Sequence, residues 1–312
     1  MDCIVTGGAG FIGSNLVDAL IARGDRVAVI DNLKTGKLEN LAAATAAGAQ
    51  LHRLDVRDAV ALDAVFASVR PQVVFHLAAQ IDVRSSVEDP AADAQVNVLG
   101  ALNVLSAALA YGARRVVNTS TGGGLYGDAA LLPTPEEHPV RPLAPYGQSK
   151  YAAEGYFELY TRLHGLSTVS LRYGNVYGPR QDVHGEAGVV AIFCGCLIDA
   201  ATPRIFGDGR QTRDWVEVAD VVQANLQAAD SDVTGPFNIG WGEETSVLEL
   251  VRELRRVGAE HGLSLPAPEF LPARAGEVSR SCLDVRRARA ELGWEPRTRL
   301  DTGLAQILAG LL

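Results

Sequence analysis

Near its N-terminus the chain reads Cys3-Ile4-Val5-Thr6-Gly7-Gly8-Ala9-Gly10-Phe11-Ile12-Gly13, an apolar run followed by four glycines in seven residues. The apolar run predicts a buried strand, and residues 11–23 predict a helix that begins close behind it. Gly7 and Gly8 allow the chain to turn tightly, and Gly10 allows the backbone to approach a phosphate. Gly13 lets the helix lie close on the sheet. Because the N-terminus of a helix attracts anions, the pattern predicts a site for the pyrophosphate of a dinucleotide.

A second apolar strand is predicted at residues 26–30, and it ends in Asp31. An acid at this place can accept hydrogen bonds from both hydroxyls of the adenosine ribose, and it would repel a 2′-phosphate. The residues therefore predict NAD, in preference to NADP, as the cofactor.

The composition is typical of a compact globular protein. The 312 residues are 47% hydrophobic and 21% charged, which suits one large domain or two smaller ones packed together. The net charge of −9 and the lack of a basic run argue against a nucleic-acid partner and an anionic membrane surface. The first predicted strand begins at Asp2, so we expect no signal peptide, and we expect no apolar stretch long enough to span a bilayer. The four cysteines and six histidines do not cluster, which predicts no metal site and a reducing, cytoplasmic compartment.

Strands and helices alternate through the first half of the chain, as is typical of a parallel sheet with helices on both faces. The expected strands are residues 3–6, 26–30, 49–54, 72–76, 115–119 and 167–172, and the expected helices are residues 11–23, 38–47, 60–69, 92–111 and 146–164. The pattern predicts an α/β fold of the Rossmann type, a doubly wound parallel sheet, as an NAD-binding domain over residues 1–175.

After Tyr173 the expected elements become shorter, and proline and glycine become more frequent. Helices are expected at residues 188–200, 247–259, 284–292 and 303–311, with a strand at 204–206 and a strand and helix within 215–229. We expect residues 176–312 to form a smaller C-terminal α/β substrate-binding domain over the carboxyl edge of the sheet, where ligands of such folds bind. The chain is expected to return to the first domain around residues 212–240.

Tyr146 and Lys150 lie four residues apart at the start of a predicted helix and therefore share one face. A tyrosine near its usual pKa of about 10 is a poor base at neutral pH. We expect the Lys150 ammonium and the positive nicotinamide of NAD⁺ to favour the phenolate. Thr121, with Ser120 beside it at a strand end, can donate to a substrate oxygen and relay its proton to Tyr146. These residues predict proton removal from an alcohol, although the pattern also fits a partly buried aromatic beside a surface lysine.

Asp55 and His76 lie at the ends of predicted strands. Asp55 has two interpretations, and His76 has one. Asp55 can accept a hydrogen bond from the adenine amine, or it can be the N-cap of the helix at 60–69, and both can hold. His76 is most simply a core histidine, and we assign it no chemistry.

Taken together, the motifs resemble those of a known family. They are GGAGFIGS at residues 7–14, Asp31-Asn32-Leu33, Asp55-Val56, His76-Leu77-Ala78-Ala79-Gln80, Ser120-Thr121, Tyr146-x-x-x-Lys150 and Leu171-Arg172-Tyr173-Gly174-Asn175-Val176-Tyr177-Gly178-Pro179. Over essentially its whole length the chain resembles the extended short-chain dehydrogenases/reductases, the NAD-dependent sugar epimerase/dehydratase family, and is most similar to UDP-glucose (UDP-galactose) 4-epimerases. The resemblance implies Thr121, Tyr146, Lys150 and Ser120 as the catalytic residues.

The resemblance also implies two sets of binding residues. For NAD they are Gly7, Gly10, Phe11, Ile12, Gly13, Asp31, Asn32, Lys34, Asp55, Val56, Leu77, Ala78, Ala79, Gln80, Asn97, Tyr146, Lys150 and Tyr173. For a UDP-sugar they are Arg84, Thr121, Tyr146, Asn175, Val189, Phe206, Gln211, Arg213, Arg274, Glu277 and Ser281. In this assignment Asn175, Arg213 and Arg274 bind the diphosphate, which suits the forked geometry of the two arginines, although surface solvation also explains them. Val189 and Phe206 lie by the uracil.

The reaction implied by the resemblance inverts C4 of the sugar. Tyr146 removes the proton of the C4 hydroxyl, a hydride passes to NAD⁺, and the flat 4-keto sugar turns over before the hydride returns to its other face. NAD is regenerated in each cycle and is expected to stay tightly bound. A homodimer is expected through the helices at 92–111 and 146–164, whose outer faces are apolar.

Departures from the family patterns bear on the substrate. Members that dehydrate across C5 and C6 carry Asp-Glu after the threonine, and this chain has Gly122-Gly123, which argues against a 4,6-dehydratase. The Thr-x-Glu pattern of decarboxylating members is also absent. A threonine at Asn175 is usual in glucuronate epimerases, although Arg84 and the three-glycine turn leave UDP-glucuronate as an alternative. Ser281 stands where narrow epimerases carry tyrosine, which predicts activity on UDP-GlcNAc as well as UDP-glucose. A non-catalytic, cofactor-sensing protein is a further alternative.

Overall fold

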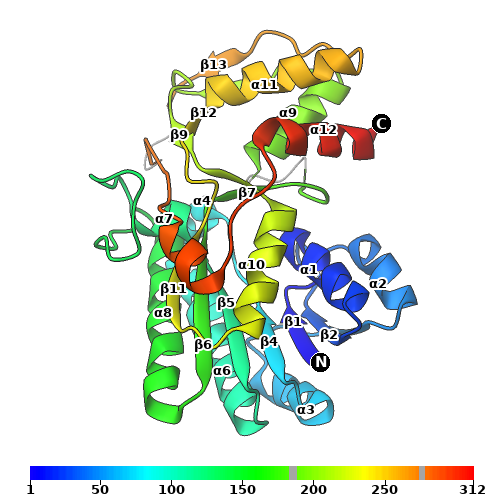
Figure 1. Ribbon diagram of the computed structural model, residues 1–312, viewed down its shortest axis with the longest axis vertical. Helices are drawn as coiled ribbons and strands as arrows, with labels where there is room; N and C mark the ends of the chain where they lie inside the picture. The colour runs from blue at the N-terminus through cyan, green and yellow to red at the C-terminus, as the bar shows by residue number, and fades with distance from the viewer. Residues whose placement is uncertain (183–187, 274–277) are drawn as a thin grey trace.

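A computed structural model describes residues 1–182, 188–273 and 278–312 (Figure 1). Its centre is a seven-stranded sheet in the order β11-β6-β5-β4-β1-β2-β3, with every neighbouring pair parallel. The strands are β1 (Asp2–Thr6), β2 (Arg26–Asp31), β3 (Gln50–Arg53), β4 (Val73–His76), β5 (Arg115–Thr121), β6 (Ser167–Tyr173) and β11 (Gly235–Ile239). The order reverses between β1 and β4, which is the doubly wound Rossmann arrangement. The predicted fold class is confirmed.

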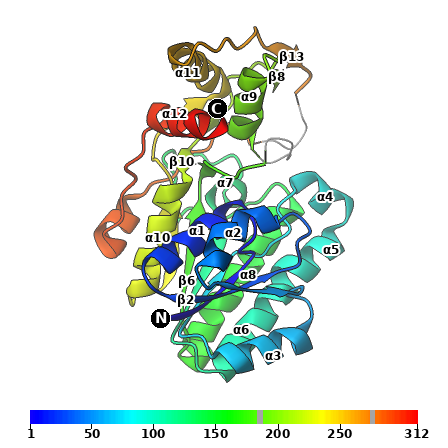
Figure 2. The same ribbon diagram turned by 90° about the vertical axis from the view of Figure 1, so that its right-hand side faces the viewer.

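Alternating side chains of the strands enter two cores, one on each face of the sheet. Cys3, Val5 and Val29 pack with α1 (Phe11–Ala22) and α10 (Val218–Asp230). Ile4 and Ile30 pack with α3 (Ala59–Val69), α6 (Gly100–Ala110) and α8 (Pro145–His164). Figure 2 shows the first group of helices and the second on opposite sides of the sheet. Because both faces are covered, the strands read as continuous apolar runs in the sequence.

The helix expected at 92–111 begins earlier and is not regular. It starts at Pro90, includes α5 (Pro90–Ala94), widens into a π-helical turn at Gln95–Leu99 and continues as α6. By length and composition alone Pro90–Ala110 could cross a membrane, so the expectation that no apolar stretch is long enough was wrong. Ala101, Val104 and Leu105 pack in the core against the sheet, which accounts for the apolar composition without a membrane.

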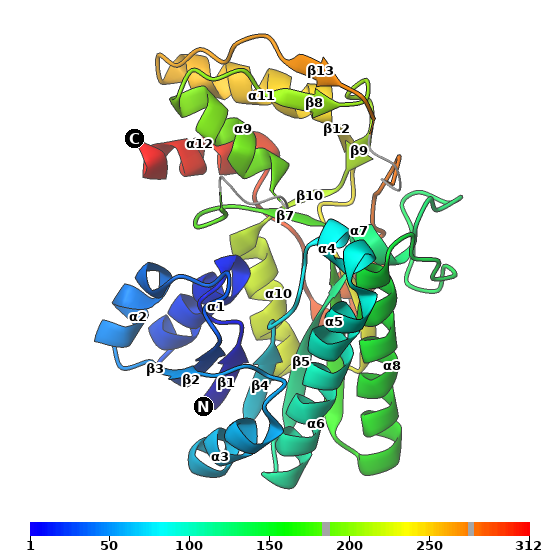
Figure 3. The ribbon, with the colours of Figure 1, turned by 180° about the vertical axis from the view of Figure 1, so that it is seen from behind.

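A smaller group of elements lies above the carboxyl ends of the strands (Figure 3). It contains α9 (Val189–Ile198), β8 (Arg204–Phe206), α11 (Val247–Glu260) and α12 (Leu300–Leu311), which share a third core, and β13 (Glu269–Leu271), which pairs with β8. Short strands connect it to the sheet: β7 (Asn175–Tyr177) pairs with β10 (Trp215–Glu217), and β9 (Thr212–Arg213) pairs with β12 (Thr245–Ser246). From β10 the chain re-enters the first layer through α10 and β11.

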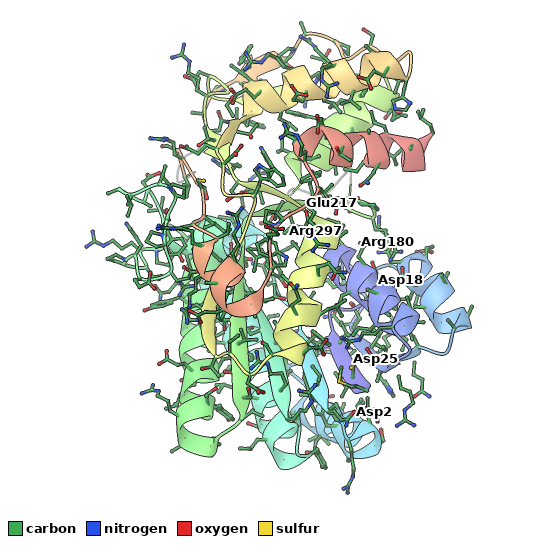
Figure 4. All side chains as sticks on the ribbon, viewed as in Figure 1. Asp2, Asp18, Asp25, Arg180, Glu217 and Arg297 are labelled. Atoms are coloured by element: carbon green, nitrogen blue, oxygen red, sulfur yellow. The ribbon has the colours of Figure 1, made fainter. Side chains whose placement is uncertain are left out.

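The segment after β7 also contacts the first layer directly. Arg180 forms an ion pair with Asp18 of α1, and the two side chains lie beside each other in Figure 4. Asn15 of the same helix donates to the carbonyl oxygen of Pro179 at 3.1 Å. These contacts hold the start of the smaller part against the helix that follows the glycine-rich turn.

Two one- to two-turn helices have no counterpart among the expected elements. They are α4 (Val83–Glu88) and α7 (Gly122–Leu125). The second contains three consecutive glycines, which are poor helix formers. Thr121 supplies its N-cap, with Oγ1 accepting from Gly124 N at 3.1 Å. This short helix is therefore stabilised by the Thr121 cap and by close packing around it, and not by the helix propensity of its residues.

Candidate active site

The glycine-rich turn has the shape that the sequence predicts. Gly7 has a φ of +72°, and a Cβ at this residue would lie 2.6 Å from the amide nitrogen of Ala78. A Cβ at Gly13 would overlap Gly7 O and lie 2.8 Å from Gly8 Cα. Helix α1 therefore comes very close to the turn. No side chain caps α1, so its first N–H groups are available to an anion at Gly10.

Asp31 ends β2 and lies buried beside this turn. Its Oδ2 accepts from Ala9 N at 2.9 Å, and its Oδ1 accepts from Leu33 N at 2.8 Å. These bonds fix the plane of the carboxylate, and each oxygen keeps a lone pair for a ribose hydroxyl. Asn32 is exposed and donates to Asp55 Oδ2 at 2.9 Å, while its Oδ1 accepts from Lys34 N. The site thus fits NAD in two ways. The turn has glycines at positions where a Cβ would collide with the backbone, and Asp31 is an acid held in a fixed orientation for the ribose.

The alternative role of Asp55 as a helix N-cap is wrong. Asp58 caps α3, accepting from Ala61 N at 3.0 Å. Asp55 instead forms a two-pronged contact with Arg57, at 2.9 Å for both pairs of atoms. These hydrogen bonds hold the pKa of Asp55 far below its usual range. The next residue, Val56, is buried and packs against Gly100 of α6.

Thr121, Tyr146 and Lys150 meet at the carboxyl end of β5. The side chains of Tyr146 and Thr121 are hydrogen-bonded to each other. Lys150 is 4% exposed, and its Nζ donates to the carbonyl oxygen of Thr119 at 3.0 Å. Ser120 points to the opposite face of the strand, because side chains alternate, and its buried hydroxyl has no partner among the described residues. The structure brings Thr121, Tyr146 and Lys150 together, and Ser120 makes no side-chain hydrogen bond with any of them.

The expectation that Lys150 lowers the pKa of Tyr146 is wrong for the protein by itself. Burial and then the charge of Asp93 raise the pKa of Tyr146 to about 12, and the hydrogen bond with Thr121 opposes this rise. Burial also lowers the pKa of Lys150 to about 8, against the opposing charges of Asp93 and Glu154. The cost of burying a phenolate is therefore larger than any gain from the neighbouring ammonium.

Asp93 is a residue of this site that the sequence reasoning missed. It is 1% exposed, and its Oδ1 accepts from Gln80 Nε2 and Asn97 Nδ2, both at 3.0 Å. Asn97 in turn holds both backbone groups of Gln80, accepting from its N and donating to its O at 2.9 Å. The spacing of four residues between Asp93 and Asn97 was the available signal, since it puts both on one helix face.

The residues of the segment 77–80 follow β4 and lie next to the glycine-rich turn. Leu77 N donates to Thr6 O at 3.0 Å, and Ala78 N donates to Thr6 Oγ1 at 3.2 Å. His76 forms a 2.9 Å hydrogen bond with the same hydroxyl. Burial and the charge of Lys150 lower the pKa of His76 to about 3, so it is neutral, as a core histidine should be. Ala79 and Gln80 follow in the same loop.

Tyr173 lies at the end of β6, opposite Thr121 in the sheet register. Its ring is buried, and its hydroxyl meets Asn225 Nδ2 at 2.7 Å and Thr119 Oγ1 at 3.3 Å. Its hydroxyl therefore points to the α10 side of the sheet.

Two residues expected at the sugar, Asn175 and Ser281, border one space next to Thr121. A Cβ at Gly123 would lie 3.5 Å from Asn175 Oδ1 and 4.0 Å from Ser281 Oγ. A Cβ at Gly124 would lie 3.4 Å from Thr121 Oγ1. The Oδ1 atom of Asn175 is buried without a hydrogen-bond partner among the described residues. The three-glycine turn thus leaves a space bordered by the polar side chains of Asn175, Ser281 and Thr121.

The other expected substrate residues are more scattered. Gln211 donates to the carbonyl oxygen of Phe206 at 2.8 Å, and Arg213 donates to that of Thr212 at 2.7 Å. Val189 begins α9 and is half-buried, while Arg84 is exposed on α4 in the first layer. Arg274 and Glu277 lie outside the described residues. Within the described ranges, no group of three or more His, Cys, Asp or Glu side chains could hold a metal ion.

Comparison with known proteins agrees with this geometry. A family model described as GDP-mannose 4,6 dehydratase matches residues 4–307. The chain belongs to this family. The resemblance to the extended short-chain dehydrogenases/reductases that act as sugar epimerases and dehydratases is thereby confirmed.

Within the family the chain is similar to UDP-glucose 4-epimerases. That of Mycolicibacterium smegmatis is 47% identical over 309 residues, which cover 98% of this chain and 97% of the relative. The structure of the Thermotoga maritima UDP-glucose 4-epimerase with UDP-glucose has a TM-score of 0.94 and 43% identity, and covers 100% of this chain and 98% of that one. The Thermus thermophilus UDP-glucose 4-epimerase in complex with NAD has a TM-score of 0.91 and 42% identity, with 99% and 98% covered.

Proposed function

We propose that the protein is an isomerase, an NAD-dependent 4-epimerase of UDP-hexoses that interconverts UDP-glucose and UDP-galactose. The observation that carries the proposal is the meeting of Tyr146, Thr121 and Lys150 at the strand ends beside a dinucleotide turn. The relatives and solved structures named UDP-glucose 4-epimerase support the choice of reaction and substrate.

NAD would be held along the sheet edge, by the turn residues Gly7, Gly10 and Gly13 at the pyrophosphate and by Asp31 at the adenosine ribose. When bound, NAD supplies a hydride acceptor beside the sugar carbon and a positive charge that favours the phenolate form of a nearby tyrosine. Tyr146 and Lys150 would contact its nicotinamide end.

The protein's own residues move the proton and orient the sugar. Tyr146 Oη takes the proton of the C4 hydroxyl and returns it after the ring has turned over. Thr121 donates to the same oxygen, and its hydroxyl is oriented by the amide of Gly124 and by the phenol. Lys150, fixed by the Thr119 carbonyl, keeps an ammonium beneath the site. Holding these groups in place before the sugar arrives lowers the barrier for proton transfer.

The same site opposes dehydration as the main reaction. Removal of water across C5 and C6 needs a proton donor after the threonine, and Gly122 and Gly123 carry none. Leu283 explains why no donor fits at residue 122, because a Cβ there would lie 2.5 Å from its Cδ1 atom. The space bordered by Gly123, Asn175 and Ser281 supports a wider choice of sugar, including an N-acetyl group on C2.

The proposed enzyme is a cytoplasmic homodimer. Exposed apolar side chains on the π-helical turn, α6 and α8 support pairing through these elements; they are Leu99, Leu109, Tyr151, Tyr156, Leu159 and Leu163. Figure 3 shows the two helices side by side on the outside of the molecule. All four cysteines are free thiols, which supports a reducing compartment.

Product analysis tests the proposal. The purified protein is incubated separately with UDP-glucose, UDP-galactose, UDP-GlcNAc and UDP-glucuronate, and the products are separated and weighed by mass spectrometry. We expect the two hexoses to interconvert with no change in mass. Loss of the mass of one water would identify a dehydratase, and lack of conversion of every substrate by the NAD-loaded protein would overturn the proposal.

A further inference from the structure

The substrate side of the site is gathered around one buried carboxylate, that of Asp214, which has no exposed surface and lies between β9 and β10. Its Oδ1 accepts from Trp241 N at 2.5 Å, and its Oδ2 accepts from Gly242 N at 3.1 Å and Leu283 N at 2.9 Å. Its main-chain carbonyl accepts from Asn175 N at 2.6 Å. One residue thus binds the backbone of three segments that are far apart in the sequence.

Two glycines allow the backbone to pack closely around Asp214. A Cβ at Gly240 would lie 2.5 Å from its Oδ2, and a Cβ at Gly174 would lie 2.8 Å from its carbonyl oxygen. Gly174 follows β6, and Gly240 follows β11, so the ends of two neighbouring strands close on this residue. The tight fit fixes the carboxylate relative to the sheet.

Two of the three segments that Asp214 binds carry a residue expected to bind the UDP-sugar, and a third such residue lies next to Asp214 itself. Asn175 is bound directly, Arg213 is the preceding residue, and Ser281 lies two residues before Leu283. The Leu283 side chain also fills the space next to Gly122, the residue after Thr121. The position of the Leu283 backbone therefore affects both the sugar side and the catalytic turn.

We infer that Asp214 is a positioning residue for the UDP-sugar: it places Asn175, Arg213 and Ser281 relative to the catalytic turn at Thr121, without touching the ligand. The inference deepens the proposed function and rests on it, because those residues matter only if a nucleoside diphosphate sugar is the substrate. The inference predicts no effect of Asp214 on NAD binding, because its hydrogen bonds do not reach residues 7–13 or Asp31.

Asp214→Asn tests the inference with little change in shape. An amide replaces one acceptor oxygen by a donor, which would face a backbone N–H and lose that bond. We expect KM for UDP-galactose, and Kd for UDP measured by calorimetry, to rise about tenfold or more, equivalent to about 1.4 kcal/mol. The NAD retained per protomer should not change, and kcat should fall much less than KM rises.

Asp220→Asn is the matched control. Asp220 is also a buried acid, 4% exposed, and accepts a backbone hydrogen bond from Thr298 N at 2.9 Å, but it lies on α10 away from the sugar. If both variants lower Tm and neither changes KM or the Kd of UDP, Asp214 is only structural and the inference is overturned. Loss of NAD from the Asp214 variant would overturn it as well.

Gly240→Ala perturbs the same carboxylate without altering it, because the new Cβ would press on Oδ2. We expect the same rise in KM with NAD retained, whereas Gly310→Ala, where a Cβ meets nothing within 4 Å, should keep the wild-type KM. If neither Asp214→Asn nor Gly240→Ala accumulates as folded protein, the role is structural and the inference fails. The proposed function fails separately, when the wild-type protein converts no UDP-sugar.

Discussion

The cofactor side and the sugar side of this site are built differently. On the cofactor side, the sites for the pyrophosphate and the adenosine ribose come from one continuous stretch, residues 2–33, in which glycines allow close backbone packing and Asp31 is held by amides of Ala9 and Leu33. The sugar side comes from several distant segments that a single carboxylate, that of Asp214, joins. Local sequence thus determines the first, whereas the second exists only when the chain has folded. Substitutions should separate the two sides by which ligand they affect.

The largest effect is expected where both sides meet, at Tyr146. Tyr146→Phe removes the hydroxyl that takes the proton and should lower kcat about a thousandfold, the usual range for loss of a general base. NAD content should remain as in the wild type, measured by absorbance after denaturation, because the ring is kept. Turnover at the wild-type rate would favour a cofactor-sensing protein without catalysis.

A second substitution should break the cofactor side alone. Gly13→Ala should lose bound NAD, because the new Cβ would collide with Gly7 O, and overpacking of this kind costs about 1–3 kcal/mol. The sign of the change in the free energy of unfolding is informative, because alanine in place of glycine in an unobstructed helix stabilises the protein by up to about 1 kcal/mol. Gly310→Ala in α12 should show that gain. NAD content and thermal unfolding measure both, and a Gly13→Ala protein with full NAD would contradict the close-packed turn.

Ser281→Tyr tests how the sugar side selects its substrate. The added ring should fill the space that Ser281 shares with Gly123 and Asn175, and thereby remove activity on UDP-GlcNAc while activity on UDP-glucose persists. The ratio of kcat/KM for the two substrates should change by about tenfold or more, as a steric exclusion does. Equal loss of both activities would show that the serine does not select the sugar.

The smallest effect is expected from Arg57→Gln. The Asp55 pKa is lowered in the folded protein, so the pair adds stability above the ordinary carboxyl pKa of 3.8, and that stability is lost as the pH falls below it. At pH 7 we expect the variant to lose about 0.5 kcal/mol or less, because solvent reaches both side chains, which are 48% (Arg57) and 25% (Asp55) exposed. Denaturant unfolding at pH 7 and pH 3 measures the difference, which should shrink at the lower pH.

A matched pair lies on the other side of the molecule. Asp284 and Arg286 have the same spacing and the same two-pronged contact as Asp55 and Arg57. Arg286→Gln should leave NAD affinity unchanged, whereas Arg57→Gln should weaken it by freeing Asp55 beside the adenine. An equal change of NAD affinity in both variants would show that Asp55 does not bind the cofactor.

The sequence predicts the cofactor side well because its signals are local. Residues 3–31 contain the strand, the glycines, the helix and the acid in order, and each has a fixed physical role. The same local logic failed at Asp55, where Asp58 three residues later caps the helix instead. It also did not predict the π-helical turn at Gln95–Leu99, in which Asn97 is hydrogen-bonded to Gln80, a residue outside the helix.

The sugar side and the electrostatics resisted prediction for a different reason. Asp93 and Asp214 are ordinary acids in the sequence, and only burial by distant segments makes them important. In the protein by itself, burial and the charge of Asp93 raise the pKa of Tyr146, and the spacing of residues in the sequence says nothing of burial. That the nicotinamide of bound NAD⁺ favours the phenolate stays a prediction.

The return of the chain to the first layer has a consequence for how the protein is made. β11 is the edge strand beside β6, and Trp294, 1% exposed, packs in the core shared by β1 and α1 and donates to Asp220 O at 2.8 Å. A ribosome must therefore release nearly the entire polypeptide before the nucleotide-binding half can close its interior. We therefore expect the coenzyme to bind late in synthesis, and we expect a chain that ends before Trp294 to expose apolar surface of the first layer.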